Sequence, residues 1–103
     1  MNFFEQVYKI VKSIPYGSVM SYGDIAELLG NRRMARQVGW ALHVNPDPEH
    51  IPCYRVVNRF GEVSSAFAFG GGKVQRELLE REGVIFDEKG RVKPCFFVKN
   101  KIE

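Results

Sequence analysis

Two prolines within four residues, in the segment Asn45-Pro46-Asp47-Pro48, constrain the fold of this 103-residue chain more than any other feature. Proline cannot continue a helix, because it lacks a backbone N–H and disfavours helical geometry in the residue before it. Apolar side chains before this break recur at helical spacing, whereas after it they fall mostly in short runs between turn formers. We therefore expect the chain to reverse here, between a helical part and a part with short strands.

Two helices are predicted in the first thirty residues. The apolar residues of segment 3–11 recur at helical spacing, and the pattern ends at the turn formers of segment 15–17. A second, short helix begins at Ser21, an N-capping residue placed three positions before the carboxylate of Asp24. It ends at Gly30, a residue type typical of helix C-termini.

A third helix, expected over residues 32–44, is basic on one side. Its apolar stripe comprises Met34, Val38, Ala41 and Leu42. Its other side carries Arg32, Arg33, Arg36, Gln37 and Trp40. Two helices joined by a short corner, the second of them cationic, indicate a helix-turn-helix that binds DNA. A solvated face that binds nothing explains the pattern equally well.

Beyond the proline-rich break, residues 51–58 are predicted to form a short buried strand. A turn at residues 59–61 would then return the chain through Glu62 and Val63, in the manner of a wing. Residues 64–72, SSAFAFGGG, are expected to form a loop that approaches a ligand or flexes. The remaining chain predicts a helix over Lys73–Glu82 and a terminal hairpin built from Val84–Phe86 and Arg91–Val98.

Length and composition limit the class of protein. A chain of 103 residues with 45% hydrophobic and 26% charged residues predicts one folded domain over residues 1–103, of α+β class and mainly helical. Its net charge of +3 permits an anionic partner without requiring one. Two cysteines make no disulfide framework, and no signal peptide or membrane-spanning run occurs. We expect a cytoplasmic monomer without a membrane partner, associated with the nucleoid if the source is bacterial.

Cys53, in the run IPCYRVV, is the sharpest candidate for chemistry. By composition alone, a small buried side chain is the favoured interpretation and a reactive thiol the alternative. Cys95, in an apolar terminal segment, is interpreted as a buried structural residue. His43 and His50 have no paired zinc-ligand spacing with these cysteines, and the glycines of segment 70–72 lack the spacing of a phosphate-binding loop. We expect no metal and no cofactor.

Four motifs carry a resemblance to a known family: IPYGSVMSYGDIAELLG, ARQVGWALHVNP, IPCYRVVN and LLEREG. Together they closely resemble the C-terminal DNA-binding domain of the O6-alkylguanine-DNA alkyltransferases (methylated-DNA-protein-cysteine methyltransferases) and the small alkyltransferase-like proteins. The match covers roughly residues 3–86 in order. It implies a winged helix-turn-helix whose second helix enters the DNA minor groove and which flips the damaged guanine out of the stack. In the alkyltransferases, a cysteine then takes the alkyl group irreversibly.

The resemblance assigns roles by position. It makes Cys53 the alkyl acceptor and Arg36 the side chain that fills the space left by the flipped base. Tyr22 matches the tyrosine that helps to rotate the nucleotide's phosphate. Asn45 matches the asparagine at the bend before the active-site strand, and Glu82 the glutamate of the cysteine's hydrogen-bond network.

Other residues of the third helix suit contact with DNA. Ala35 and Gly39 are small enough to let the helix backbone approach a groove, and Arg32 and Arg33 are placed to contact phosphates. Binding that depends on such contacts weakens as salt concentration rises.

This sequence departs from the alkyltransferase pattern in three respects. Tyr54 stands where alkyltransferases have a histidine that helps to form the thiolate, and a phenol with a pKa of about 10 does not serve as that base. Alkyltransferase-like proteins, which bind the lesion without repairing it, have tryptophan at the Cys53 position and often an aromatic residue next to it. The loop 64–72 also differs from the family pattern, with Phe67 and Phe69 as candidates to stack on an extruded base.

Three functions remain open at this stage. The first is a repair protein for double-stranded DNA containing O6-alkylguanine, with Cys53 as a slow, single-turnover alkyl acceptor. The second is a nonreactive lesion sensor that recruits nucleotide excision repair proteins. The third is a sequence-reading winged-helix regulator in which Cys53 fills space, and it ranks last because it leaves the Asn45-to-Cys53 motif unexplained.

Overall fold

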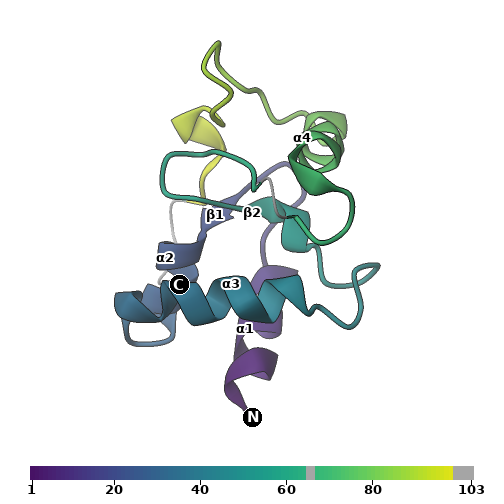
Figure 1. The fold of residues 1–103 in the computed structure, drawn as a ribbon. Helices are drawn as coiled ribbons and strands as arrows, with labels where there is room; N and C mark the ends of the chain where they lie inside the picture. Colours follow the sequence, from purple (N-terminus) through teal and green to yellow (C-terminus); the bar gives the residue numbers. More distant parts are fainter. Residues whose placement is uncertain (65–66, 99–103) are drawn as a thin grey trace.

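The computed structural model describes residues 1–64 and 67–98, which measure 38 × 27 × 22 Å along the principal axes. Helices α1, α2 and α3 gather at one end of the molecule and α4 lies at the other, with strands β1 and β2 between them (Figure 1). The mainly helical α+β class predicted from the sequence is confirmed.

Side-chain caps define the starts of the first two helices, and of these caps only that of Ser21 is predicted from the sequence. Helix α1 (Phe3–Lys12) has a capping box in which Asn2 and Glu5 each accept the other's backbone N–H. Helix α2 (Tyr22–Leu28) follows Ser21, whose hydroxyl accepts a backbone hydrogen bond of 3.0 Å from the first turn. These side chains satisfy N–H groups that have no partner within their helices.

The third helix differs from the prediction of one helix over residues 32–44. Arg32–Met34 forms a turn of 3-10 helix, and α3 covers only Ala35–His43. Gly30, with a φ of 103°, turns the chain, and the Asn31 side chain accepts a backbone hydrogen bond of 2.9 Å from the new turn. This tight corner imposes 3-10 geometry before α3 begins.

The strand predicted over residues 51–58 is wrong for most of its length. Only β2 (Val56–Val57) is a strand, and it pairs in parallel with β1 (Met20–Ser21), with Met20 opposite Val56. Cys53–Arg55 instead forms a turn of 3-10 helix. Pro52 explains the difference, because it has no N–H for a ladder and its carbonyl accepts a hydrogen bond of 3.0 Å from the end of this turn.

The turn after β2 occurs as predicted, but the returning strand of the wing does not. Gly61 has a φ of 85°, and the Asn58 N–H donates to the carbonyl of Glu62 at 3.1 Å. Glu62 and Val63 have no strand assignment, because the chain then turns toward the 64–72 loop. Residues 65 and 66 of that predicted loop lie outside the described part of the chain.

Helix α4 (Gly71–Arg81) begins two residues before its predicted start and ends one residue before its predicted end. Gly70 has a φ of 129°, and a Cβ on it would lie 2.8 Å from a methyl of Val74. Only glycine fits this entry to the helix. Gln75 and Leu79 form its buried side.

The terminal hairpin is confirmed at its turn but is shorter than predicted. Phe86 and Val92 form an antiparallel bridge, after which the chain leaves to pair in parallel beside Val19. Pro94–Phe96 forms a turn of 3-10 helix, and Cys95 on it is exposed. The prediction of a buried Cys95 in a strand is therefore wrong, because the turn that begins at the proline directs the thiol outward.

Buried apolar side chains form two clusters. The first cluster joins α1, α2 and α3 to the Cys53 turn. The second comprises Val19, Val57, Leu79, Val84 and Val92. Within residues 1–64 and 67–98, no helix is both long and apolar enough to cross a membrane, and no group of three metal-ligating side chains occurs.

Candidate functional site

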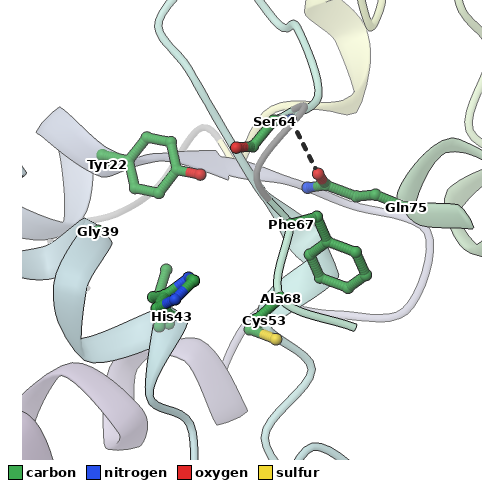
Figure 2. Close-up of a pocket in the computed structure, with 9 residues that line it drawn as sticks. Tyr22, Gly39, His43, Cys53, Ser64, Phe67, Ala68 and Gln75 are labelled. Carbon is green, nitrogen blue, oxygen red and sulfur yellow. Dashed lines mark hydrogen bonds between the residues drawn. The ribbon is translucent and has the colours of Figure 1, made fainter. Parts of the chain in front are cut away.

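A pocket with a volume of about 170 Å³ opens between α3 and the turn that carries Cys53. In Figure 2, Tyr22, Gly39 and His43 lie on one side of this pocket, and Cys53, Phe67 and Gln75 lie on the other. Its remaining lining residues are Leu42, Ser64 and Ala68. We call this cavity the Cys53 pocket. Most of these side chains are apolar or aromatic and a few are polar, which is the composition typical of a small-molecule site.

The Cys53 thiol is buried at the wall of the pocket. Only 6% of the residue is exposed, and it also packs against the first apolar cluster. Burial raises the pKa of the thiol, and a hydrogen bond from Asn45 opposes this rise only in part. Because the thiolate is the nucleophilic form, the resting site holds a weakly nucleophilic, neutral sulfur.

Asn45 fixes the loop that leads to Cys53. Its amide donates to the carbonyl of Ile51 at 2.9 Å and its Oδ1 accepts the backbone N–H of Asp47 at 2.8 Å. The residue is 6% exposed, so these bonds form in a buried setting where they hold the backbone firmly. This position follows α3 directly and suits the bend that the sequence motif indicates.

Glu82 lies at the centre of a second group of polar side chains. Its carboxylate accepts the Gly17 N–H at 2.8 Å, the Tyr54 hydroxyl at 2.5 Å and the Arg55 Nη2 at 2.8 Å. Arg55 also donates to the carbonyl of Ile14 at 3.0 Å. The side chains of Arg55 and Glu82 are 14% and 4% exposed, so this ion pair is largely shielded from water.

The charges in this group are stable near neutral pH. Burial alone would raise the pKa of Glu82, but hydrogen bonds from Arg55, Tyr54 and Gly17 outweigh burial and hold it below its usual value. Burial and the hydrogen bond to Glu82 raise the pKa of Tyr54. Tyr54 is therefore a protonated donor whose proton is directed at Glu82, and it does not act as a base.

Cys53 and Tyr54 belong to different parts of the core. Cys53 packs with the first apolar cluster, whereas Tyr54 packs with the second and points its hydroxyl at Glu82. The four residues predicted as catalytic thus separate into two groups. The structure brings Asn45 to Cys53 and brings Tyr54 to Glu82.

The residues predicted to contact DNA lie on α3 and beside it. Arg33 and Arg36 are exposed, whereas Ala35 is half-buried. A Cβ on Gly39 would lie 4.0 Å from the Tyr22 ring, so the helix and this ring are close neighbours. Tyr22 lines the pocket, and burial raises the pKa of its phenol.

Arg32 differs from the other two arginines. Its guanidinium lies 3.5 Å from Asp24 and rests against Gly23, on which a Cβ would lie 2.6 Å from Nη1. The Arg32 side chain is 56% exposed and that of Asp24 only 12%. Arg32 is thus directed toward α2, although an ion pair with one exposed partner is weak enough to open.

Sequence reasoning missed three residues of the site. His43 lines the pocket, and its spacing of seven from Arg36 would have placed both on one helix face. Gln75 accepts the Ser64 N–H at 3.0 Å and donates to the carbonyl of Val56 at 2.8 Å, which joins α4 to the pocket wall. Nothing local in the sequence indicates this contact, nor the pairing of Arg55 with a glutamate 27 residues away.

The fold is that of a winged helix-turn-helix DNA-binding domain. The family model described as "6-O-methylguanine DNA methyltransferase, DNA binding domain" matches residues 2–84, and the chain belongs to this family of alkylguanine DNA-binding repair domains. The resemblance drawn from the sequence motifs is thereby confirmed.

Relatives with different names share this domain. The chain is 43% identical over 84 residues to alkyltransferase-like protein 1 of Schizosaccharomyces pombe, covering 81% of this chain and 77% of the relative. It is 41% identical over 91 residues to the DNA base-flipping protein of Escherichia coli, covering 88% and 69%. It is 39% identical over 84 residues to the methylated-DNA–protein-cysteine methyltransferase of Rattus norvegicus, covering 81% of this chain but only 40% of that enzyme.

A solved structure supports the same family membership. The fold matches S. pombe Atl1 in complex with damaged DNA containing O6-carboxymethylguanine, with a TM-score of 0.77 and 39% identity over 94% of both chains. The match extends over nearly the whole chain, whereas the match to the rat methyltransferase covers less than half of that protein.

Proposed function

We propose that this protein, acting as a monomer, recognises O6-alkylguanine in double-stranded DNA, flips the damaged nucleotide into the Cys53 pocket and marks the lesion without repairing it. The observation that carries the proposal is the pocket itself. Cys53 lies in its wall, and the pocket is bordered by Tyr22, Gly39 and His43, on or beside the helix that carries the exposed Arg36. A protein that reads an atom inside a duplex must take that base out of the stack.

The basic helix supports the DNA-binding part of this proposal. Arg36 is exposed on α3, and it has the length and charge to occupy the space of an extruded base. Arg33 is exposed on the same helical region and is available to a phosphate. Ala35 and Gly39 are small residues on this helix, so the helix backbone can approach a DNA groove closely there. The relatives named for base flipping and for alkyltransferase likeness support this reading.

The electrostatics of the site support recognition over repair. Burial keeps the Cys53 thiol protonated, and Tyr54 offers it no base because its hydroxyl donates to Glu82. Loss of general-base assistance slows a reaction by about 10²- to 10⁴-fold. We propose that the bound complex persists instead and that excision repair proteins bind to it.

Irreversible alkyl transfer to Cys53 is the second candidate, because the sulfur lines the pocket. In that reaction, the thiol loses its proton, the sulfur attacks the alkyl carbon and the carbon–O6 bond breaks. The bonding electrons pass to the guanine, which recovers a proton, and the protein keeps a thioether. Each molecule would react once. A sequence-reading regulator is not favoured, since the chain belongs to a family defined by alkylguanine.

One experiment separates these functions. The protein is incubated with duplex DNA that contains O6-methylguanine and with the matched undamaged duplex, and binding and the mass of the Cys53 peptide are both measured. We expect lesion-selective binding with an unmodified peptide. A methyl group on Cys53 would establish transfer, and equal binding to both duplexes would contradict both lesion functions.

A further inference from the structure

The chain's single tryptophan, Trp40, is exposed on α3 beside the pocket. Its exposed fraction is 58%, although the same helix buries Val38, Ala41 and Leu42 completely or nearly so. A single exposed apolar side chain is common on protein surfaces and indicates nothing by itself. Trp40 differs from such a residue because it stacks on a ring of the pocket and shares a helix face with Arg36.

The indole of Trp40 stacks on the ring of His43. Their centroids lie 5.6 Å apart with an interplanar angle of 22°, and His43 lines the Cys53 pocket. The stack therefore holds the indole in a defined orientation at the pocket rim. An aromatic side chain held in this way loses little conformational entropy when it binds a second ring.

Trp40 also shares a helix face with Arg36. Residues four apart lie on the same side of an α-helix, separated by a rise of about 6 Å. That rise spans fewer than two base steps, since neighbouring bases on a strand lie about 3.4 Å apart. If Arg36 occupies the space of the extruded base, Trp40 is within reach of the bases next to that space.

We infer that Trp40, oriented by His43, stacks on a nucleobase next to the position that the flipped guanine leaves. This inference rests on the proposed function. In an intact duplex, neighbouring bases cover each other's faces, so an aromatic side chain finds no open surface. Extrusion of one nucleotide uncovers the adjacent base faces; the narrow guanidinium of Arg36 covers only part of this area, and an apolar ring that covers another part stabilises the open state. Trp40 therefore favours damaged over intact DNA.

Intrinsic fluorescence tests this contact directly, because Trp40 is the only tryptophan. The protein is titrated with an O6-methylguanine duplex and with the matched intact duplex, while the anisotropy of a dye on the DNA reports binding independently. We expect loss of Trp40 emission with the damaged duplex and much less loss with the intact one. Unchanged emission while anisotropy reports lesion binding would overturn the inference and leave the proposed function intact.

Substitutions add an energetic test. Trp40→Ala should weaken lesion binding about tenfold while intact-duplex binding is nearly unchanged, and Trp40→Phe should retain most of the affinity. His43→Ala removes the ring that orients the indole, so the damaged duplex should quench Trp40 emission less in this variant than in the unsubstituted protein. The control is Ile85→Ala, another exposed apolar residue, at 52%, placed beyond α4. Circular dichroism verifies that each variant folds.

Two results would overturn this energetic prediction. Equal losses on both duplexes for Trp40→Ala would make the residue a general contact, and unchanged lesion binding would make it a bystander. Anisotropy without any preference for the lesion in the unsubstituted protein would instead refute the proposed function and this inference together.

Discussion

Cys53 and Tyr54 are neighbours on one turn of 3-10 helix, yet they belong to two regions with opposite properties. The Cys53 pocket is open, contains a neutral thiol and adjoins the exposed face of α3. The region around Glu82 is closed, charged and held by hydrogen bonds from Tyr54, Arg55 and Gly17. The first region has a cavity with space beside the thiol, and the second holds the backbone next to it in place.

This difference explains how the fold can keep Cys53 in the pocket wall while no neighbouring base takes up its thiol proton. The family resemblance assigns Glu82 to the hydrogen-bond network of the cysteine. In this structure, its carboxylate instead accepts hydrogen bonds from the largely buried guanidinium of Arg55 and from the Tyr54 hydroxyl. The same carboxylate therefore acts as a structural anchor between α4, the Cys53 turn and the loop at Gly17. If the two regions are separate, substitutions in one should leave the properties of the other nearly unchanged.

Tyr54→His should produce the largest effect, because it adds a base between the two regions. Imidazole titrates near neutral pH, so it can accept the thiol proton and be oriented by Glu82. We expect methylation of Cys53 by an O6-methylguanine duplex to accelerate by about 10²-fold or more, measured by the mass of the Cys53 peptide over time. Tyr54→Phe, which removes the hydroxyl without adding a base, should give no acceleration. Equal rates for Tyr54→His and the unsubstituted protein would show that a missing base does not limit transfer.

Glu82→Gln should destabilise the fold by about 3 kcal/mol, because it leaves the charge of Arg55 buried without its partner. The free energy of unfolding in urea measures this. Glu80→Gln is the matched control two residues away, near the end of α4, since Glu80 pairs with Arg76 at 3.3 Å but is 47% exposed. That change should cost less than about 1 kcal/mol. Similar losses for the two variants would show that the Glu82 region is not specially shielded.

The stability of the protein should also depend on Glu82 through pH. Its pKa is lowered in the folded protein, so as pH falls the unfolded chain takes up the proton first. The stabilising contribution is complete above the ordinary carboxyl pKa and is lost as pH falls through the lowered one. Unfolding free energies measured from neutral to acid pH should therefore fall less steeply in Glu82→Gln. Identical pH profiles would contradict the assignment.

Arg36→Ala should give a smaller effect, which changes DNA binding but not the stability of the Glu82 region. Loss of the side chain that fills the vacated space should weaken lesion binding by about tenfold, and intact-duplex binding by less. Arg33→Ala is the matched control, because a phosphate contact should lower both affinities alike. Equal losses on both duplexes for Arg36→Ala would reduce it to a phosphate contact.

Local signals predicted the elements that local chemistry determines. Ser21 caps its helix, Gly61 and Gly90 turn the chain with positive φ, and α3 ends before the prolines that follow Asn45, as expected. The strand predicted over residues 51–58 is wrong for a local reason as well: Pro52 has no N–H for a ladder, and its carbonyl accepts the hydrogen bond that closes the 3-10 turn.

The candidate site divides into residues that local motifs indicate and residues that distant contacts bring in. Its motif residues were found because they lie within short, recognisable runs of sequence. Arg55 and Gln75 were missed because their partners lie 27 and 11 to 21 residues away and become neighbours only when α4 packs onto the turn. The packing of Tyr54 likewise depends on the second apolar cluster, which no single motif contains.

The most direct test of the central claim compares the two cysteines of one molecule. Cys53 lines the pocket and Cys95 is exposed, so a small thiol reagent followed by peptide mass analysis reports on each separately. With saturating O6-methylguanine duplex, labelling of Cys53 should slow strongly while that of Cys95 continues, and an equally saturating intact duplex should leave both rates nearly unchanged. Unchanged labelling of Cys53 in the lesion complex would mean that the extruded base does not enter the pocket, and the account would fail.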